Sequence, residues 1–193
     1  MPRLILASTS PYRREILARL GVPFEAVAPV CDETPLAGES AADTANRLAV
    51  LKAQSLVSRF PDALVIGSDQ VALLDGQQLG KPHTVENAHA MLAAMRGRSV
   101  VFHTALCVLN AATGRQQTVV DTTTVTLHPY TDAQITRYLA QEPDALHCAG
   151  AAKSEGLGGA LIARIDSIDP NALIGLPLFA LITLLAQEGV EIL

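Results

Sequence analysis

The sequence predicts an α/β fold built on a mixed β-sheet. Apolar runs with the composition of buried strands alternate along the chain with amphipathic helical segments, as they do in α/β domains. Two long β-rich segments, 99–109 and 116–127, flank a short turn and predict an antiparallel pair, so the sheet is not purely parallel. A length of 193 residues suits one large domain or two small lobes, and a hydrophobic content of 49% is enough for a sizeable core.

Local signals define the elements in the first half of the chain. Ser10 is a good N-cap, Pro11 suits the first turn of a helix, and Gly21 is a good C-terminal stop. The dipeptide Asp75-Gly76 between two short β-type runs predicts a two-residue hairpin turn. We expect strands at 4–7, 24–28 and 64–66, helices at 11–20 and 41–60, a loop at 30–40, and a hairpin that pairs 71–74 with 77–79.

Capping signals place two helices in the second half of the chain. Thr84 is suited to cap one helix, and Thr131 with Gln134 predicts a capping box at the start of another. The apolar run 173–185, which Gly175 and Pro177 interrupt, predicts a buried helix at the end of the chain. We expect helices at 84–95, 131–141 and 177–188, a small-residue loop at 149–159, and a strand at 160–165.

Composition argues against several classes of function. The net charge of −5 disfavours a nucleic-acid polymer as partner, because such binders usually carry a basic face, whereas a single nucleotide needs only a few local cations. The N-terminal apolar run is too short for a secretory signal, and no stretch approaches the roughly 20 apolar residues of a membrane span. Cys31, Cys107 and Cys148 show no zinc-ligand spacing, so we expect a reducing cytoplasmic setting.

The segment from Leu4 to Arg14 predicts an anion site. An apolar run ends at Ser8 and Ser10, and a helix with Arg13 and Arg14 in its first turn follows at once. The first N–H groups of a helix have no internal partners, and the helix dipole adds positive charge at the same end. Cations suit the other end of a helix, so arginine here favours a role in holding phosphate. A plain helix start capped by Ser10 is the alternative interpretation.

Two acidic motifs are candidate metal or catalytic sites. Asp32 and Glu33 follow a predicted strand, and adjacent carboxylates near a phosphate site suit a hard cation; a solvated acidic turn is the alternative. Asp69 comes directly after the apolar run 64–66, and strand ends are where α/β folds place ligands. A buried ionised Asp needs a partner or a metal. Otherwise Asp69 caps a turn before the hairpin.

Two lysines and a small-residue loop complete the candidates. Lys52 interrupts an apolar helical stretch and Lys81 follows the hairpin, and lysine is a common point-charge partner of phosphates. In the run Lys-Ser-Glu-Gly at 153–156, small neighbours let a ligand approach the backbone, and Glu155 could accept hydrogen bonds from a base edge. Each of these residues, taken alone, is more often a surface residue.

Taken together, these stretches resemble the Maf family of nucleoside triphosphate pyrophosphatases over essentially the whole chain. Any one motif is weak, but the ordered set is specific. The matching stretches are Leu-Ala-Ser-Thr-Ser-Pro-Tyr-Arg-Arg at 6–14, Asp-Glu-Thr at 32–34, Lys52, Gly-Ser-Asp-Gln at 67–70, Gly-Lys-Pro at 80–82 and Gly-Leu-Pro at 175–177.

The resemblance implies cleavage of a nucleoside triphosphate between the α and β phosphates, with Mg²⁺ or Mn²⁺ as the divalent cation. It implies a single domain over 1–193 with an elongated, two-lobed α/β fold similar to that of inosine triphosphate pyrophosphatases, and a homodimer. Asp69 is then the expected proton acceptor, and Glu33 and Asp69 are the expected metal ligands. The residues expected at the phosphates are Ser8, Ser10, Arg13, Lys52 and Lys81.

Three positions imply the subfamily that acts on 7-methyl-GTP. Members that act on dTTP and UTP typically have Arg, Thr and Gln where this chain has Tyr12, Gln70 and Glu155. Tyr12 offers an aromatic face to the cationic 7-methylguanine ring, worth roughly 0.5–2 kcal/mol. Glu155 offers a carboxylate to the N1–H and the exocyclic amine of guanine. Packing of Tyr12 on its own helix is the alternative.

Two other functions stay open at this point. One is a dTTP/UTP pyrophosphatase of the same fold, against which Tyr12 and Glu155 argue. The other is a nucleotide-binding regulator of septum formation and cell division, since the family has been linked to septum formation. Asp69 together with both lysines favours an enzyme, because binding alone does not require a proton acceptor.

Overall fold

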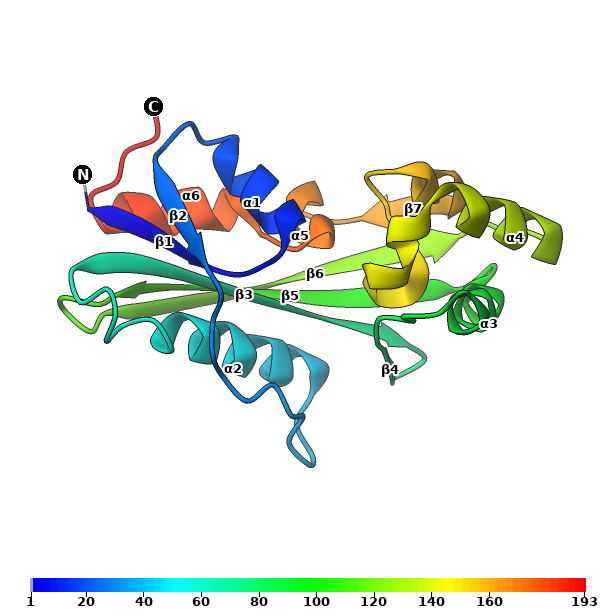
Figure 1. Cartoon of the computed structure of the whole chain (residues 1–193), viewed down its shortest axis with the longest axis horizontal. Coiled ribbons are helices and arrows are strands. Elements are labelled where there is room, and N and C mark those ends of the chain that lie inside the picture. Colours follow the sequence, from blue (N-terminus) through cyan, green and yellow to red (C-terminus); the bar gives the residue numbers. More distant parts are fainter. Residues whose placement is uncertain (1) are drawn as a thin grey trace. The chain divides into compact units, whose positions relative to one another are not determined.

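The computed structural model describes residues 2–193, and within it the chain divides into two compact units (Figure 1). The first unit runs to Gln70 and includes His103–Asp121 and Asp169–Leu193. The second unit comprises Val71–Phe102 and Thr122–Ile168. Among residues 2–193, no helix is both long enough and apolar enough to cross a membrane.

A mixed β-sheet combined with α-helices confirms the predicted fold class. The strand order is β2-β1-β3-β5-β6-β7, and β4 also pairs with β3. β1 is parallel to β2 and β3, whereas β4 is antiparallel to β3, and β7 to β6. Residues 111–115 alone join the neighbours β5 and β6, which is too short for a parallel crossover, so this pair is antiparallel as predicted. The strands are β1 (Arg3–Ala7), β2 (Phe24–Val27), β3 (Ala63–Leu74), β4 (Gln77–Leu79), β5 (Ser99–Asn110), β6 (Gln116–Leu127) and β7 (Ile162–Asp166).

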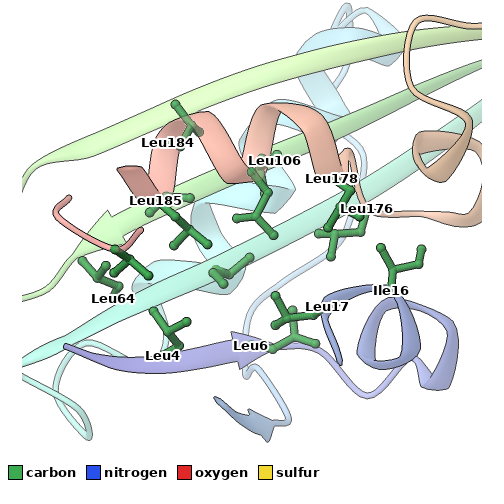
Figure 2. Packing of buried hydrophobic residues seen from close by; sticks show 14 residues of the cluster. Leu4, Leu6, Ile16, Leu17, Leu64, Leu106, Leu176, Leu178, Leu184 and Leu185 are labelled. Carbon is green, nitrogen blue, oxygen red and sulfur yellow. The ribbon is translucent and has the colours of Figure 1, made fainter. Parts of the chain in front are cut away.

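In the first unit, alternate strand residues point into a leucine-rich core. These residues face helices α1 (Pro11–Ala18) and α6 (Leu178–Gln187), which lie on the same side of the strands (Figure 1). Figure 2 shows leucines of β1, β3 and β5 directed toward those of α6. Full burial of each such side chain contributes about 1.5–3 kcal/mol. The buried cluster comprises Leu4, Leu6, Ile16, Leu17, Leu64, Ile66, Leu106, Val108, Leu176, Leu178, Leu181, Leu184, Leu185 and Val190.

Helix α2 (Ala41–Gln54) covers the opposite face of these strands (Figure 1). Its backbone approaches β3 at Gly67, where a Cβ atom would lie 2.1 Å from the Ala49 carbonyl oxygen and 2.9 Å from the Ala53 nitrogen. No side chain fits between the two backbones at this position. The close approach brings the C-terminal turn of α2, which carries Lys52, directly onto the middle of β3.

The second unit packs α3 (Val85–Met95) against α4 (Asp132–Gln141). Both predicted N-termini are confirmed: Thr84 caps α3, and Thr131 with Gln134 forms the capping box of α4. The buried Tyr130 hydroxyl donates to the Leu92 carbonyl oxygen at 2.9 Å, and burial raises the pKa of Tyr130 to about 12. Three short 3-10 helices complete this unit: η1 (Pro143–His147), η2 (Ala149–Ala151) and η3 (Leu157–Leu161).

The predicted hairpin with its two-residue turn at Asp75 and Gly76 is confirmed. Ala72 pairs with Leu79, and both turn residues have positive φ, 49° at Asp75 and 81° at Gly76. These are the signs of a type I′ turn, whose twist matches that of the flanking strands.

Several element boundaries differ from the prediction. Helix α2 ends at Gln54 instead of 60, because the Ser55 hydroxyl donates to the Lys52 carbonyl oxygen and the chain continues in i→i+3 turns. β3 is one continuous strand, so the separate runs 64–66 and 71–74 were wrong. The last strand is displaced to β7, and part of the loop 149–159 forms 3-10 turns. A short helix that was not predicted, α5 (Pro170–Ile174), precedes α6.

Candidate active site

Lys52 joins two carboxylates of the first unit. Its Nζ lies 2.6 Å from Asp69 Oδ1 and 3.0 Å from Glu33 Oε2. The side chains of Lys52 and Asp69 are only 8% and 11% exposed, whereas that of Glu33 is 55% exposed. Burying an ion pair of this kind is costly unless the charges stay paired, so removing either Lys52 or Asp69 would leave its partner as an unpaired buried charge.

The pleat of β3 explains why these groups meet. Residues two apart on a strand share a face, so Asp69 lies on the face that Gly67 presents to α2. Because α2 approaches closely at Gly67, Lys52 reaches Asp69 one strand step further along. The juxtaposition therefore depends on a glycine at 67 as much as on the two charged residues.

Asp69 lies inside a strand and does not follow the end of one, which corrects the sequence-based placement. β3 continues to Leu74, but its parallel neighbour β1 ends at Ala7, which pairs with Gly67. Asp69 therefore lies just past the carboxyl end of the adjacent strand. Carboxyl ends of parallel strands are where α/β folds bind ligands. Asp69 does lie at such an end, but the strand that ends there is β1 and not β3.

The serines at the start of α1 shape the loop between β1 and the helix. Ser10 is the N-cap, and its hydroxyl accepts from the Arg13 backbone N–H at 3.4 Å. The buried Ser8 hydroxyl accepts from the Ser10 N–H at 3.1 Å. The predicted helix start is confirmed, and it places both hydroxyls at the positively polarised end of α1. Tyr12 follows in the first turn and is half-buried.

Arg13 ties α1 to the segment before α6. Its Nε donates to the Gly175 carbonyl oxygen at 2.8 Å, and the Ser68 hydroxyl donates to the same oxygen at 2.9 Å. Burial lowers the pKa of Arg13, and the Asp69 and Glu33 carboxylates oppose that shift. The Arg13 guanidinium is thus a second cation that interacts electrostatically with both acids of the Lys52 cluster.

Gln70 points to the opposite face from Asp69. Its Nε2 lies 2.9 Å from Thr104 Oγ1 and 3.0 Å from each of the Ala172 and Leu173 carbonyl oxygens. This amide therefore anchors α5. Asp169, buried and not considered as a site residue from the sequence, accepts from the N–H groups at the starts of α5 and α6.

A network that sequence reasoning missed holds the loop carrying Glu33. Arg47 Nε lies 2.7 Å from Glu39 Oε1, and its guanidinium also donates to the Thr34 carbonyl oxygen at 3.2 Å. Asp32 Oδ1 accepts from the Thr34 N–H at 2.9 Å, so Asp32 shapes the loop. No local sequence signal links residues 39 and 47, which meet only because the loop folds back on α2.

The second unit holds the two remaining predicted residues. Lys81 is exposed two residues after the end of β4, and Glu155 is exposed between Ala152 and η3. A cavity of about 430 Å³ in this unit contains none of the predicted site residues. Its lining consists of His128, Pro129, Tyr130, Gln134, Arg137, Tyr138, Gln141, Leu157, Ala160 and Leu161.

The residues of the first unit fit a divalent cation that is bound together with a phosphate ligand. Among residues 2–193, no group of three or more His, Cys, Asp or Glu side chains could hold a metal. Glu33 and Asp69 supply two carboxylates, which both contact the Lys52 ammonium. Mg²⁺ commonly uses one or two carboxylates, several waters and substrate phosphates, and it does not need an all-protein cage.

The family match and the similar proteins agree with one another. A family described as "Maf-like protein" matches residues 3–188. A Chromobacterium violaceum protein named 7-methyl-GTP pyrophosphatase is 64% identical over 98% of both chains. Proteins of the same name from Thiobacillus denitrificans and Methylobacillus flagellatus are 59% and 56% identical over 100% of this chain, and over 95% and 100% of their own.

Among solved structures, the Staphylococcus aureus Ham1 protein matches with a TM-score of 0.46 and 14% identity. The match covers 66% of this chain and 72% of that one.

Proposed function

We propose, from the premise that the chain belongs to the Maf family, that it hydrolyses 7-methyl-GTP to 7-methyl-GMP and diphosphate. Three relatives at 56–64% identity over nearly the whole chain carry the name of that activity. The observation that carries the chemistry is the buried Lys52 ammonium held between Asp69 and Glu33. It fixes two carboxylates beside Arg13 and the start of α1, where a triphosphate would be bound.

Asp69 is the proposed proton acceptor. Lys52 Nζ donates to Oδ1 at 2.6 Å and fixes the orientation of the carboxylate, and Oδ2 receives the proton of the attacking water. The water oxygen bonds to the α-phosphorus as the bond from that phosphorus to the α–β bridging oxygen breaks. Diphosphate leaves with that oxygen, and the new oxygen stays on 7-methyl-GMP.

A divalent cation, Mg²⁺ or Mn²⁺, would be held by Glu33 and Asp69. When bound, it would neutralise charge on the phosphate oxygens. Arg13, Lys52 and the N-terminus of α1 at Ser8 and Ser10 bind the triphosphate and stabilise the charge that grows on it. Lys81, of the second unit, is the remaining proposed phosphate ligand.

Base selection is assigned to Tyr12 and Glu155. The 7-methylguanine ring is cationic, so an aromatic face and a carboxylate suit it better than they suit uracil or thymine. Gln70 is the third position that differs between subfamilies, and its contacts with α5 support an indirect part in shaping the site.

The proposal extends to the cellular setting. We place the protein in the cytoplasm as a homodimer without a nucleic-acid partner. The three cysteines show no zinc-ligand spacing, which suits a reducing compartment, and the net charge of −5 disfavours a polyanion.

Hydrolysis in ¹⁸O-labelled water tests the direction of attack. We expect the label in 7-methyl-GMP and none in diphosphate, because water attacks the α-phosphorus. Label in diphosphate would show attack at the β-phosphorus and would refute this mechanism. The products are separated and read by mass spectrometry.

A further inference from the structure

We infer that Glu142 and Tyr138 are positioning residues for base selection, because together they fix the turn that presents Glu155. The inference rests on the proposed function, in which Glu155 recognises the guanine base. All of these residues belong to the second unit. Neither Glu142 nor Tyr138 was predicted from the sequence.

Glu155 lies in a β-turn formed by residues 153–156. The Gly156 N–H donates to the Lys153 carbonyl oxygen at 3.1 Å and closes the turn. The Glu155 side chain is exposed, and its Oε2 accepts from the hydroxyl of its neighbour Ser154 at 3.2 Å. The position of this exposed carboxylate therefore depends on the backbone of the turn.

Glu142 binds the turn on both sides of Glu155. Its Oε1 lies 3.2 Å from Lys153 Nζ, and its Oε2 accepts from the Leu157 backbone N–H at 3.1 Å. Only 14% of the Glu142 side chain is exposed, so these charge-assisted bonds are largely shielded from water. One carboxylate at the end of α4 thus connects the residues two before and two after Glu155.

Tyr138 fixes the chain that enters the turn. Its hydroxyl donates to the Ala151 carbonyl oxygen at 3.0 Å and accepts from the Lys153 N–H at 3.0 Å. The residue is 4% exposed, and burial raises the pKa of Tyr138 to about 12. The hydroxyl therefore keeps its proton at neutral pH and makes both bonds at once.

Glycines leave room for these contacts. At Gly156 a Cβ atom would lie 2.4 Å from Glu142 Oε2, and at Gly158 it would lie 2.5 Å from the Lys153 carbonyl oxygen. The turn, its glycines and the two side chains of α4 form one tightly packed arrangement. That arrangement leaves the Glu155 carboxylate exposed at the turn, as expected if its role is to present Glu155.

A second acid also contacts the lysine of the turn. Asp144 Oδ2 lies 2.8 Å from Lys153 Nζ, and this hydrogen bond lowers the pKa of Asp144. The Lys153 ammonium is thereby drawn toward Glu142 and Asp144. Because Glu142 and Asp144 already pair with Lys153, the Glu155 carboxylate is left to interact with the cationic 7-methylguanine base.

The test compares kcat and KM for 7-methyl-GTP and GTP in the wild type and in Glu142→Gln, Tyr138→Phe and Glu155→Gln. Glu142→Gln should lower the preference for 7-methyl-GTP, measured as the ratio of kcat/KM values, by roughly tenfold. The loss should fall on KM for 7-methyl-GTP more than on kcat, because hydrolysis is assigned to the first unit. Tyr138→Phe should act in the same direction. Glu86→Gln, an exposed acid of α3 in the same unit, is the matched control and should leave the ratio unchanged.

The double variant Glu142→Gln/Glu155→Gln separates positioning from general stabilisation. If Glu142 acts through Glu155, the double variant should be no less selective than Glu155→Gln alone. Additive losses of selectivity would overturn the inference, as would wild-type selectivity in Glu142→Gln when Glu155→Gln has lost it. A wild type without preference for 7-methyl-GTP would instead overturn the proposed function, and the inference with it.

Discussion

Lys52 and Asp69 form a buried ion pair between α2 and β3, with Nζ 2.6 Å from Oδ1. Glu33 shares the same ammonium, so the three groups together carry one net negative charge: two carboxylates and one cation. Arg13 lies close enough for its pKa to respond to both acids. The cluster thus contains the groups to which the proposed metal-assisted hydrolysis assigns the proton acceptor, a phosphate-binding cation and the metal ligands.

Asp69→Asn tests the base directly. Asparagine keeps an oxygen for Lys52 but cannot accept the proton, so kcat for 7-methyl-GTP should fall by about 10²–10⁴-fold. The thermal midpoint should show that the variant folds. Asp62→Asn, an exposed acid of the same unit, is the control and should keep wild-type turnover. A fully active Asp69→Asn enzyme would remove Asp69 from the mechanism.

Gly67→Ala tests the close approach of α2 to β3. The added Cβ would lie 2.1 Å from the Ala49 carbonyl oxygen, so α2 must move away and carry Lys52 with it. Overpacking of this kind costs about 1–3 kcal/mol, seen as a lower urea midpoint, and turnover should fall as well. Gly80→Ala is the control, because no atom lies within 4 Å of a Cβ there. Unchanged stability at position 67 would contradict the packing described.

Glu39 and Arg47 should make stability depend on pH. Arg47 lowers the pKa of Glu39 from 4.5 to about 2. A carboxyl whose pKa is lower in the folded state stabilises the fold above its unfolded pKa and loses that contribution as pH falls through the folded value. Glu39→Gln should therefore be less stable than the wild type at pH 7.

The gap in urea midpoint between the Glu39→Gln variant and the wild type should close between pH 4.5 and about 2. Because Arg47 also binds the Thr34 carbonyl oxygen, the variant should lose turnover at pH 7 through the loop that carries Glu33. A gap that does not change with pH would show that the ion pair is not its source.

Metal removal should affect turnover and leave the fold intact. Lys52 Nζ pairs with both carboxylates, so each keeps a charged partner when the divalent cation is absent. A chelator should abolish hydrolysis without lowering the thermal midpoint, and added Mg²⁺ or Mn²⁺ should restore it. Unfolding on chelation would indicate a structural metal, and full activity would exclude a metal-dependent reaction.

Local patterns predicted much of the fold. The Asp75-Gly76 turn and the capping box of Thr131 and Gln134 are both found at the predicted residues, because each depends on local backbone hydrogen bonding and conformation. The end of α2 and the continuity of β3 were missed, because both depend on contacts with distant segments. Val30, for example, donates to the hydroxyl of Ser55 just past the end of α2.

For the candidate site, the sequence predicted individual residues but not all of the contacts among them. Lys52, Asp69 and Glu33 were predicted separately, and the structure brings them together through the pleat of β3 and the glycine at 67. Their roles in catalysis stay predictions. The hold of Arg47 on the Thr34 carbonyl could not be read from the sequence, because it joins residues that only the folded loop makes neighbours.

The most direct test of the proposed activity is release of diphosphate by the purified protein with Mg²⁺ or Mn²⁺, comparing 7-methyl-GTP with GTP, dTTP and UTP. A clear preference for 7-methyl-GTP is the expected result. A preference for dTTP or UTP would keep Asp69 and the lysines but contradict the assigned base selection. Release from none of the four would contradict the enzyme assignment and favour a nucleotide-binding regulator.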